Sequence, residues 1–391
     1  MKKIRGEKTI DEILKRGVEN IYPSKEELRK VLLSGKVLSI YNGIDPTAPT
    51  LHIGHGSTLL KLREFQDLGH NITLLIGDFT GRIGDPTDKA SARKQLSVKE
   101  VKENLKLYTK QAGKILDMKK VKVKFNSKWL GKLSFEDALS LASEFTLQQM
   151  IERDMFEKRI KEGQPIFLHE FFYPLMQGYD SVVMNVDMEI GGNDQTFNML
   201  IGRTMMKTRG KEKYVLTTKL LTDPTGKKMG KSEGNMVTLA DTSEDMFGKV
   251  MSWPDSLMSL AFEICTRMPL DDIEKAIKGN PKEAKMRLAR EIVKIYHGEK
   301  AAGKAKENFI NTFQKKEIPK EIPKIKLNEG EKLMEALVRE KILGSKNDFR
   351  RLILEGAVLD LVSQNKITDP NLVPKKGSKF KIGKKKFIEI L

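Results

Sequence analysis

Short β-rich segments alternate with helical stretches over about the first 235 residues, and this alternation constrains the fold more than any other feature. The β-rich segments are "VLSIYNGI" at 37–44, "NITLLIGDFTG" at 71–81, "KVKVKF" at 120–125 and "KYVLTTKLL" at 213–221. Strands that alternate with helices are typical of parallel βαβ units, so we expect an open α/β sheet. Such sheets bind ligands beyond the carboxyl ends of their strands, where the glycine-rich loops of this chain are expected.

The rest of the chain predicts helices and a smaller C-terminal unit. Residues 134–162 have the apolar spacing of one or two long helices, and residues 241–314 show helical periodicity without a strand signal. Two prolines in the charged segment "KKEIPKEIPKIK" predict a linker over 315–330. Residues 331–391 then form a basic module, and a length of 391 residues agrees with two or three domains.

The formal net charge of +18 favours a polyanionic partner or a strongly solvated surface. Residues 341–391 contain 12 Lys or Arg against 5 Asp or Glu, a balance of +7, so these residues carry over a third of the excess. This distribution favours a nucleic-acid contact in the C-terminal module.

The chain has one cysteine, Cys265, which excludes an internal disulfide and a metal site built from several cysteines. This cysteine usage is typical of a reducing, cytoplasmic compartment. No apolar run approaches the roughly 20 residues that cross a bilayer, and the charged N-terminal segment does not have the pattern of a secretory signal. We therefore expect no membrane partner.

His52 and His55 lie three positions apart in "LHIGHG", on either side of Gly54. If a helix begins near His52, both rings lie on one face of its first turn, where backbone N–H groups lack partners and the helix dipole is positive. Such a site suits phosphate, and the glycine allows close approach to the backbone. Two structural histidines, or a metal site that recruits further ligands, are the alternatives at this point.

A second candidate phosphate site is the loop "TGKKMGKSEGN" at 225–235. It places Lys227, Lys228 and Lys231 among glycines and a serine, an arrangement suited to closing over a polyphosphate. A lysine-rich surface turn would explain this loop alone. Two phosphate-suited loops at the same edge of one sheet make that explanation less satisfactory.

"HIGH" at 52–55 and "KMGKS" at 228–232 resemble the paired signature motifs of class I aminoacyl-tRNA synthetases. "YNGIDPTAPTLHIGH", "GDPTDKASAR", "FFYPLMQGYD" and "IGGNDQ" further resemble tyrosyl-tRNA synthetases, over essentially the whole chain. The resemblance implies a Rossmann-like catalytic domain with a parallel sheet over 1–240, with a helical insertion at about 127–186. It also implies an α-helical anticodon-binding domain over 241–314 and a small α+β RNA-binding domain of the ribosomal-protein-four type over 331–391.

The resemblance implies a pocket for L-tyrosine. Tyr41 and Asp180 match positions that hydrogen-bond the phenolic hydroxyl, and Tyr173, Gln177 and Asp85 match positions that hold the ammonium group. A pocket that donates to and accepts from a phenol leaves unpaired polar groups when phenylalanine enters, a form of rejection for which this family is the standard example. The positions implied to bind tyrosine are Tyr41, Asp85, Tyr173, Gln177, Asp180 and Gln195.

The resemblance further implies that ATP is a substrate and that Mg²⁺ accompanies it. The positions implied to act on the phosphates are His52, His55, Lys228, Lys231, Lys89, Arg93 and Thr47. The positions implied to bind the rest of ATP are Gly43, Asp45, Gly54, Gly192, Asp194, Met229 and Ser232. Thr58 and Asn126 match lesser positions. The sequence departs from the family pattern at Gly230, where the lysine loop usually has serine, and at Asn193, often Ser or Thr.

The reaction implied is attack of the tyrosine carboxylate on the α-phosphorus of ATP, followed by transfer of tyrosine to the 3′ end of tRNA. The carboxylate is ionised at neutral pH, so the first step needs positioning and charge stabilisation rather than a general base.

RNA contacts are expected from the C-terminal residues Arg350, Arg351, Lys375, Lys376, Lys379 and Lys381, and the family implies a homodimer formed through about 127–186. A tryptophanyl-tRNA synthetase and an RNA-binding relative without ligase activity are the alternative functions. Tyr41 and Asp180 favour a phenol over an indole, because an indole N–H only donates.

Overall fold

The computed structural model describes residues 6–85, 97–151, 154–222, 236–313, 322–363, 365–383 and 386–391, which form two compact units, 1–305 and 306–391. Each unit is described by itself. No helix among the described residues is long and apolar enough to span a membrane.

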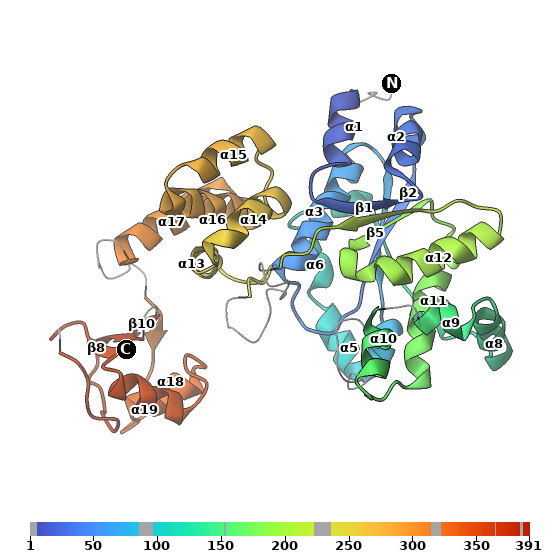
Figure 1. Ribbon diagram of the computed structural model, residues 1–391. Coiled ribbons are helices and arrows are strands. Elements are labelled where there is room, and N and C mark those ends of the chain that lie inside the picture. The colour runs from blue at the N-terminus through green and yellow to red at the C-terminus, as the bar shows by residue number, and fades with distance from the viewer. Residues whose placement is uncertain are drawn as a thin grey trace. The chain divides into compact units, whose positions relative to one another are not determined.

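The first unit contains a six-stranded sheet in the order β1-β6-β5-β2-β3-β4 (Figure 1). Its strands are β1 (Val18–Tyr22), β2 (Ser39–Ile44), β3 (Asn71–Ile76), β4 (Val121–Phe125), β5 (Met188–Gly192) and β6 (Tyr214–Thr218). Strands β2 to β6 are mutually parallel, as the alternating pattern predicted. The sequence analysis did not predict β1, which pairs antiparallel with β6 at the edge of the sheet.

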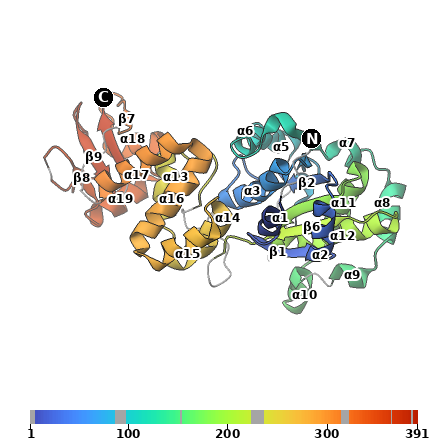
Figure 2. The same ribbon diagram turned by 90° about the horizontal axis from the view of Figure 1, so that it is seen from above.

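Helices cover both faces of this sheet. Helix α3 (Ile53–Asp67) lies on one face, and α11 (Leu168–Met184) and α12 (Thr196–Thr208) lie on the other (Figures 1 and 2). The strands between them are apolar and buried, as expected for a parallel sheet that is covered on both sides. The other helices of this domain are α1 (Glu7–Ile13), α2 (Lys25–Leu33), α4 (Thr80–Ile83), α5 (Val98–Leu105), α6 (Tyr108–Ala112), η1 (Met118–Lys120), α7 (Ser127–Leu130) and η2 (Asn193–Gln195).

The described residues of 134–162 are mostly helical, as predicted, with a break at 144–146. They contain α8 (Phe135–Ser143), α9 (Leu147–Ile151) and α10 (Asp154–Lys161), and residues 152–153 lie outside the described chain. Thr146 begins a new helix because its Oγ1 accepts from Gln149 N at 3.2 Å, while Gln149 Oε1 accepts from Thr146 N at 2.9 Å. This reciprocal cap interrupts a pattern whose apolar spacing alone would allow one continuous helix.

A helical region follows the sheet, as predicted. It contains α13 (Ser243–Met251), η4 (Asp255–Leu257), α14 (Met258–Cys265), α15 (Leu270–Lys278), α16 (Pro281–His297) and α17 (Glu299–Phe313). Helix α14 packs against α3. Helix α16 also approaches α3 closely, since a Cβ at Gly56 would collide with the Tyr296 hydroxyl.

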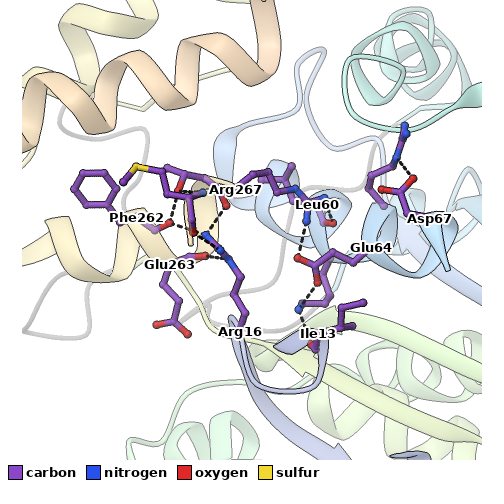
Figure 3. Close-up of polar contacts among 12 residues, drawn as sticks. Ile13, Arg16, Leu60, Glu64, Asp67, Phe262, Glu263 and Arg267 are labelled. Atoms are coloured by element: carbon purple, nitrogen blue, oxygen red, sulfur yellow. Dashed lines mark hydrogen bonds and ion pairs between the residues drawn. The ribbon is translucent and has the colours of Figure 1, made fainter. Parts of the chain in front are cut away.

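Arg16 joins the start of the chain to the end of α14 (Figure 3). Its guanidinium is buried and donates to four backbone carbonyl oxygens, those of Phe262, Glu263, Thr266 and Met268, at 3.3, 2.9, 2.8 and 2.5 Å. The last carbonyls of a helix have no partners within the helix and carry the negative end of its dipole, so a cation is well placed there.

Two further cations make contacts in the same interface. Arg267 of the helical region donates to Glu64 Oε1 of α3 at 2.6 Å and to the Leu60 carbonyl at 2.7 Å. Lys61 of α3 donates to the Ile13 carbonyl at 2.7 Å. The helical region is therefore held to α3 by Arg267 and to the N-terminal segment by the buried Arg16 (Figure 3).

The second unit is a small α+β domain, as expected for residues 331–391. Its sheet has the order β7-β10-β9-β8. The elements are β7 (Lys324–Ile325), α18 (Leu333–Arg339), α19 (Lys346–Leu354), β8 (Val358–Asp360), β9 (Lys379–Ile382) and β10 (Lys386–Ile390). Leu337, Phe349 and Phe380 lie in its core. Strand β7 lies inside the predicted linker 315–330 and pairs in parallel with β10, so this part of the segment belongs to the sheet.

Replacing Arg16 with methionine is expected to lower the free energy of unfolding of the first unit by about 2–4 kcal/mol. The change removes the Arg16 guanidinium, so four mostly buried carbonyl groups lose the hydrogen bonds that it donates. Urea unfolding followed by circular dichroism measures the effect. The matched control is Arg29→Met, which removes the surface ion pairs with Asp11 and Glu7 and should cost much less, because solvent-screened ion pairs contribute little. Equal losses for the two variants would contradict the role given to Arg16.

Candidate active site

The two histidines of "HIGH" form the first turn of α3. His52 is the N-cap residue, and its Nδ1 accepts a hydrogen bond from Gly54 N at 3.2 Å. In return, His55 Nδ1 accepts from His52 N at 3.3 Å, which makes a reciprocal capping box. The ring centres lie 3.9 Å apart. The predicted helix start at His52 and the shared face of the two rings are therefore found in the structure.

This capping arrangement determines where the imidazole hydrogens lie. Each Nδ1 accepts a backbone hydrogen bond, so a neutral ring carries its hydrogen on Nε2. Burial lowers the pKa of His55 to about 3, and the neighbouring His52 acts in the same direction. His55 therefore presents a neutral Nε2–H donor, and the Nε2 atom of His52 likewise takes no part in the capping hydrogen bonds. Gly54 is required between them, since a Cβ there would lie 3.0 Å from the His52 ring.

The chain that leaves the lysine-rich loop runs beside the histidine turn. Ile53 N donates to Val237 O at 3.0 Å, Leu239 N donates to Leu51 O at 2.8 Å, and His52 forms a β-bridge with Thr238. On the other flank, Thr218 Oγ1 at the end of β6 lies 3.3 Å from Thr58 Oγ1 of α3. Both flanks of the loop are thus anchored to the helix that carries His52 and His55, although the loop itself lies outside the described residues.

A hydrogen-bonded chain of side chains crosses the carboxyl edge of the sheet. Asp45, directly after β2, accepts from Tyr173 Oη at 2.9 Å and from Thr80 Oγ1 at 2.7 Å. Asn126 donates to Thr80 Oγ1 at 2.9 Å and to Asp180 Oδ2 at 3.2 Å. Tyr173 and Asp180 come from α11, Thr80 from the first turn of α4, and Asn126 from the end of β4. Predicted residues from three separate segments, Asp45, Asn126 and the α11 pair, therefore meet in one place.

Asp180 is buried at the end of this chain. Its second oxygen, Oδ1, accepts from Trp129 Nε1 at 2.7 Å. Burial raises the pKa of Asp180 well above its usual value, against the two hydrogen bonds from Trp129 and Asn126, which lower it. Each carboxylate oxygen keeps a free lone pair, so Asp180 can accept a further hydrogen bond from a ligand.

Tyr41 is fully buried in β2, and its hydroxyl lies 2.8 Å from Ser181 Oγ, on the residue next to Asp180. Burial raises the pKa of Tyr41 well above its usual value, and the charges of Glu189 and Asp180 act in the same direction. The phenol therefore keeps its hydrogen. Ser181 thus connects Tyr41 of the sheet to the turn of α11 that carries Asp180.

The candidates for the ammonium end are also paired. Gln177 Nε2 donates to Glu189 Oε1 at 3.0 Å, and Gln195 Nε2 donates to Asp85 Oδ2 at 2.7 Å. Two carboxylates, Asp45 and Asp85, lie at this edge of the sheet, and Asp85 is buried. Their negative charge suits a cationic ligand group.

The remaining predicted residues lie as follows. Gly43 is in β2, Gly192 ends β5, Asp194 is in η2, and Thr47 N donates to Asp45 O at 2.8 Å. In the second unit, Arg350 and Arg351 are exposed on α19, Lys375 and Lys376 are exposed before β9, and Lys379 and Lys381 are in β9. The predicted residues that lie outside the described chain are Lys89, Arg93, Lys227, Lys228, Met229, Gly230, Lys231 and Ser232.

Five further residues that were not predicted contact predicted site residues: Thr80, Trp129, Ser181 and Glu189 through hydrogen bonds, and Lys213 through its ammonium over the Tyr41 ring. Glu189 and Lys213 carried one signal, because each places a charge in or beside a strand that is otherwise apolar. Thr80, Trp129 and Ser181 carried none, since their importance depends on which strands and helices become neighbours.

Residues 33–314 match the profile of the family described as tRNA synthetases class I (W and Y). The chain is 46% identical to a tyrosine–tRNA ligase of Carboxydothermus hydrogenoformans, with 97% of each chain covered. It is 45% identical to tyrosine–tRNA ligase 2 of Clostridium acetobutylicum, with 98% of this chain and 99% of the relative covered.

Two solved structures are also similar. A C-terminally truncated mitochondrial tyrosyl-tRNA synthetase of Coccidioides posadasii has a TM-score of 0.63 at 25% identity, over 76% of this chain and 91% of that one. The tyrosyl-tRNA synthetase of Archaeoglobus fulgidus, solved with L-tyrosine, has a TM-score of 0.62 at 20% identity, over 77% and 100%, and supports the fold alone.

The pH dependence of unfolding is expected to report the neutral state of His55. Its pKa is about 3 in the folded protein and near 6.5 when unfolded, so between these values the unfolded chain binds the extra proton and stability falls as the pH is lowered. Between pH 6.5 and pH 4.5 this residue should account for about 2 kcal/mol of the loss. His55→Gln should flatten the curve by that amount in urea unfolding. Parallel curves for the two proteins would contradict the assignment.

Proposed function

The chain belongs to the family of class I tRNA synthetases for tryptophan and tyrosine and is a tyrosine–tRNA ligase, and on that basis we propose how its residues divide the reaction. The observation that supports the tyrosine specificity is that Tyr41 and Asp180 are both buried, with the Tyr41 hydroxyl 2.8 Å from Ser181 Oγ, on the residue next to Asp180. In this role Tyr41 donates to the phenolic oxygen of the substrate and Asp180 accepts its hydrogen. An indole offers only a donor, so this pair disfavours tryptophan.

We assign the ammonium group of tyrosine to Tyr173, Gln177 and Asp85. The support is the negative charge of Asp85 and Asp45 at the carboxyl edge and the polar ends of Tyr173 and Gln177 on neighbouring turns of α11. Gln195, which donates a hydrogen bond to Asp85, is assigned to the carboxylate end of the substrate. Gly43, Asp45, Gly192 and Asp194 are assigned to the nucleotide.

The phosphates of ATP are assigned to the first turn of α3. The Nε2–H groups of His52 and His55 are donors for phosphate oxygens at the positive end of the helix dipole. As the tyrosine carboxylate attacks the α-phosphorus, negative charge moves onto the departing pyrophosphate, and donors already in place stabilise it without reorganisation. We also assign to the phosphates Thr47, Lys89, Arg93, Lys228 and Lys231. Met229 and Ser232 are assigned to the rest of ATP.

ATP is a substrate of this class, and we propose that Mg²⁺ accompanies it. No group of three His, Cys, Asp or Glu side chains among the described residues is arranged to hold a metal ion. Magnesium ions in nucleotide sites take most of their ligands from phosphate and water and one or two from carboxylates, so this residue set fits the ion without a dedicated cage. Asp45 and Asp194 are the carboxylates assigned to that edge.

The RNA contacts are assigned to the helical region 241–314, as the anticodon-binding domain, and to the C-terminal domain 331–391. Support for the second comes from the exposed arginines of α19 and the lysines on and before β9. Lysine and arginine contacts of this type bind the RNA backbone and set its orientation. The partners proposed are L-tyrosine, ATP and the cognate tRNA, in the cytoplasm.

We further propose that the protein acts as a homodimer through residues 127–186. Seven of the 13 large exposed apolar side chains of the described chain lie in this segment. Phe135 and Leu168 are 80% and 81% exposed. A concentration of exposed apolar side chains in one segment marks an interaction surface.

The purified protein is expected to exchange labelled pyrophosphate with ATP when tyrosine is present. Asp180→Ala should lower kcat/KM for tyrosine about 10- to 100-fold, because it removes a charged hydrogen-bond acceptor in a buried pocket. The control is Asp78→Ala, which removes a carboxylate bonded to Ser127 at the same edge but outside the pocket contacts. Exchange with tryptophan but not tyrosine would reject the specificity. Exchange with no amino acid, together with tRNA binding, would favour the RNA-binding alternative.

Replacing both Phe135 and Leu168 with serine is expected to raise the dissociation constant of the dimer about a hundredfold or more. Each protomer then buries two fewer large apolar side chains, each worth about 1.5–3 kcal/mol. Light scattering at several concentrations measures the mass. Leu354→Ser with Val362→Ser is the matched control, with exposed apolar residues in the second unit, and should leave the mass unchanged. A monomeric starting protein would refute the proposal.

A further inference from the structure

Lys213 and Glu189 form an ion pair in the interior of the catalytic domain, and the reaction described above does not use it. Their side chains are 0% and 3% exposed. Lys213 Nζ lies 5.8 Å from the centre of the Tyr41 ring, so the pair is next to the pocket for the phenol. Removing two charges from water costs several kcal/mol per ion, which makes such a pair a poor source of stability. Its place beside Tyr41 points instead to a role in the pocket.

The Lys213 ammonium has three hydrogens and three acceptors around it. It donates to Ser181 Oγ at 2.8 Å, to the Met199 carbonyl at 3.2 Å and to the Glu189 carboxylate, its nearest partner. Helix α12 leaves room for it at Gly202, where a Cβ would lie 2.6 Å from Lys213 Nζ. The position of the ammonium is therefore fixed by its surroundings.

Lys213 determines the direction of the Ser181 hydroxyl. An ammonium group can only donate, so Ser181 Oγ accepts from it. The Ser181 hydrogen then needs another acceptor, and within the described chain its one further hydrogen-bond partner is Tyr41 Oη at 2.8 Å. Ser181 therefore donates to Tyr41. The hydrogen of Tyr41 is therefore directed away from Ser181, toward Glu189, whose side chain interacts with the Tyr41 hydroxyl, or toward a bound ligand.

Glu189 is the competitor for that hydrogen. Its charge acts on the Tyr41 hydroxyl, as does that of Asp180. However, Glu189 Oε1 already accepts from Gln177 and Glu189 Oε2 from Lys213. The ion pair reduces the attraction of Glu189 for the Tyr41 hydrogen, because Lys213 neutralises the carboxylate.

We propose that Lys213 and Ser181 are positioning residues for tyrosine specificity, which direct the Tyr41 hydroxyl to donate to the phenolic oxygen of the substrate. The same ion pair also positions Gln177, because Glu189 accepts a hydrogen bond from it. The pair therefore supports Tyr41 at the phenol end of the substrate and Gln177 at the ammonium end. This inference rests on the proposed function, and it concerns hydrogen-bond directions only, with no bond made or broken.

The first test is Ser181→Ala, read as the ratio of kcat/KM for tyrosine to that for phenylalanine in ATP–pyrophosphate exchange. Without its donor, the Tyr41 hydroxyl is free to turn to Glu189, so KM for tyrosine should rise about fivefold with little change in kcat. Phenylalanine makes no use of that hydroxyl, so its kcat/KM should stay the same. Ser181→Cys, with a weaker donor, should give an intermediate ratio.

The second test asks whether the effect of losing Lys213 comes from the unneutralised charge of Glu189. Lys213→Met leaves Glu189 unpaired and free to take the Tyr41 hydrogen, so the ratio should fall more than in Ser181→Ala. Lys213→Met combined with Glu189→Gln removes both charges and should recover part of the ratio. The control is Thr266→Val, which removes a buried hydroxyl bonded to Phe262 and Met268 in the helical region and should leave the ratio unchanged.

The outcomes separate this inference from the proposed function. If the starting protein shows no exchange with tyrosine, the proposed function fails. If it exchanges with tyrosine, and folded Ser181→Ala keeps the starting ratio or loses activity equally for both amino acids, the positioning role is overturned. A double variant no better than Lys213→Met overturns the part given to Glu189. Thermal unfolding of each variant establishes whether it is folded. If the Lys213 variants do not fold, the result for Ser181→Ala alone decides whether the positioning role stands.

Discussion

The catalytic domain depends on the requirement that each polar side chain buried at the carboxyl edge of the sheet finds a hydrogen-bond partner. An unpaired polar group in such a place costs about 1–3 kcal/mol, so the buried residues form a connected set. Hydrogen bonds of 2.7–3.2 Å link Tyr173 to Asp45, Asp45 to Thr80, Thr80 to Asn126 and Asn126 to Asp180. The pocket is therefore ordered before a ligand arrives, and a ligand with the wrong donors or acceptors meets groups that are already fixed.

Helix α3 connects this edge to the helical region. Its first turn holds His52 and His55, and its later turns carry Leu60 and Glu64, which bind Arg267. The flank of the lysine-rich loop is hydrogen-bonded to the same first turn through Val237 and Leu239. One helix thus carries His52 and His55 at its start and anchors the helical region along its length.

Local patterns were sufficient for much of the fold. The strands β2 to β6 and the start of α3 follow from apolar runs, alternation and glycine positions, which act over a few residues. The edge strand β1 was missed because its pairing with β6 joins residues almost 200 positions apart. The position of the break within 134–162 did not follow from the apolar spacing, which continues through Thr146, whose side-chain cap starts a new helix. The lysine-rich loop was recognised from its residues alone and lies outside the described chain.

The sequence by itself determined the family, the motifs and the residue types of the pocket, because short motifs hold residues that must be neighbours along the chain. The capping of His52 by His55 is of this kind, since both atoms belong to one helical turn. Only the tertiary structure decided that Ser181 and Lys213, 32 positions apart, share a hydrogen bond behind Tyr41, which is 140 positions from Ser181. The physical reason is that a buried hydroxyl takes its direction from every donor and acceptor around it, and the packing of β2, β6, α11 and α12 chooses those neighbours.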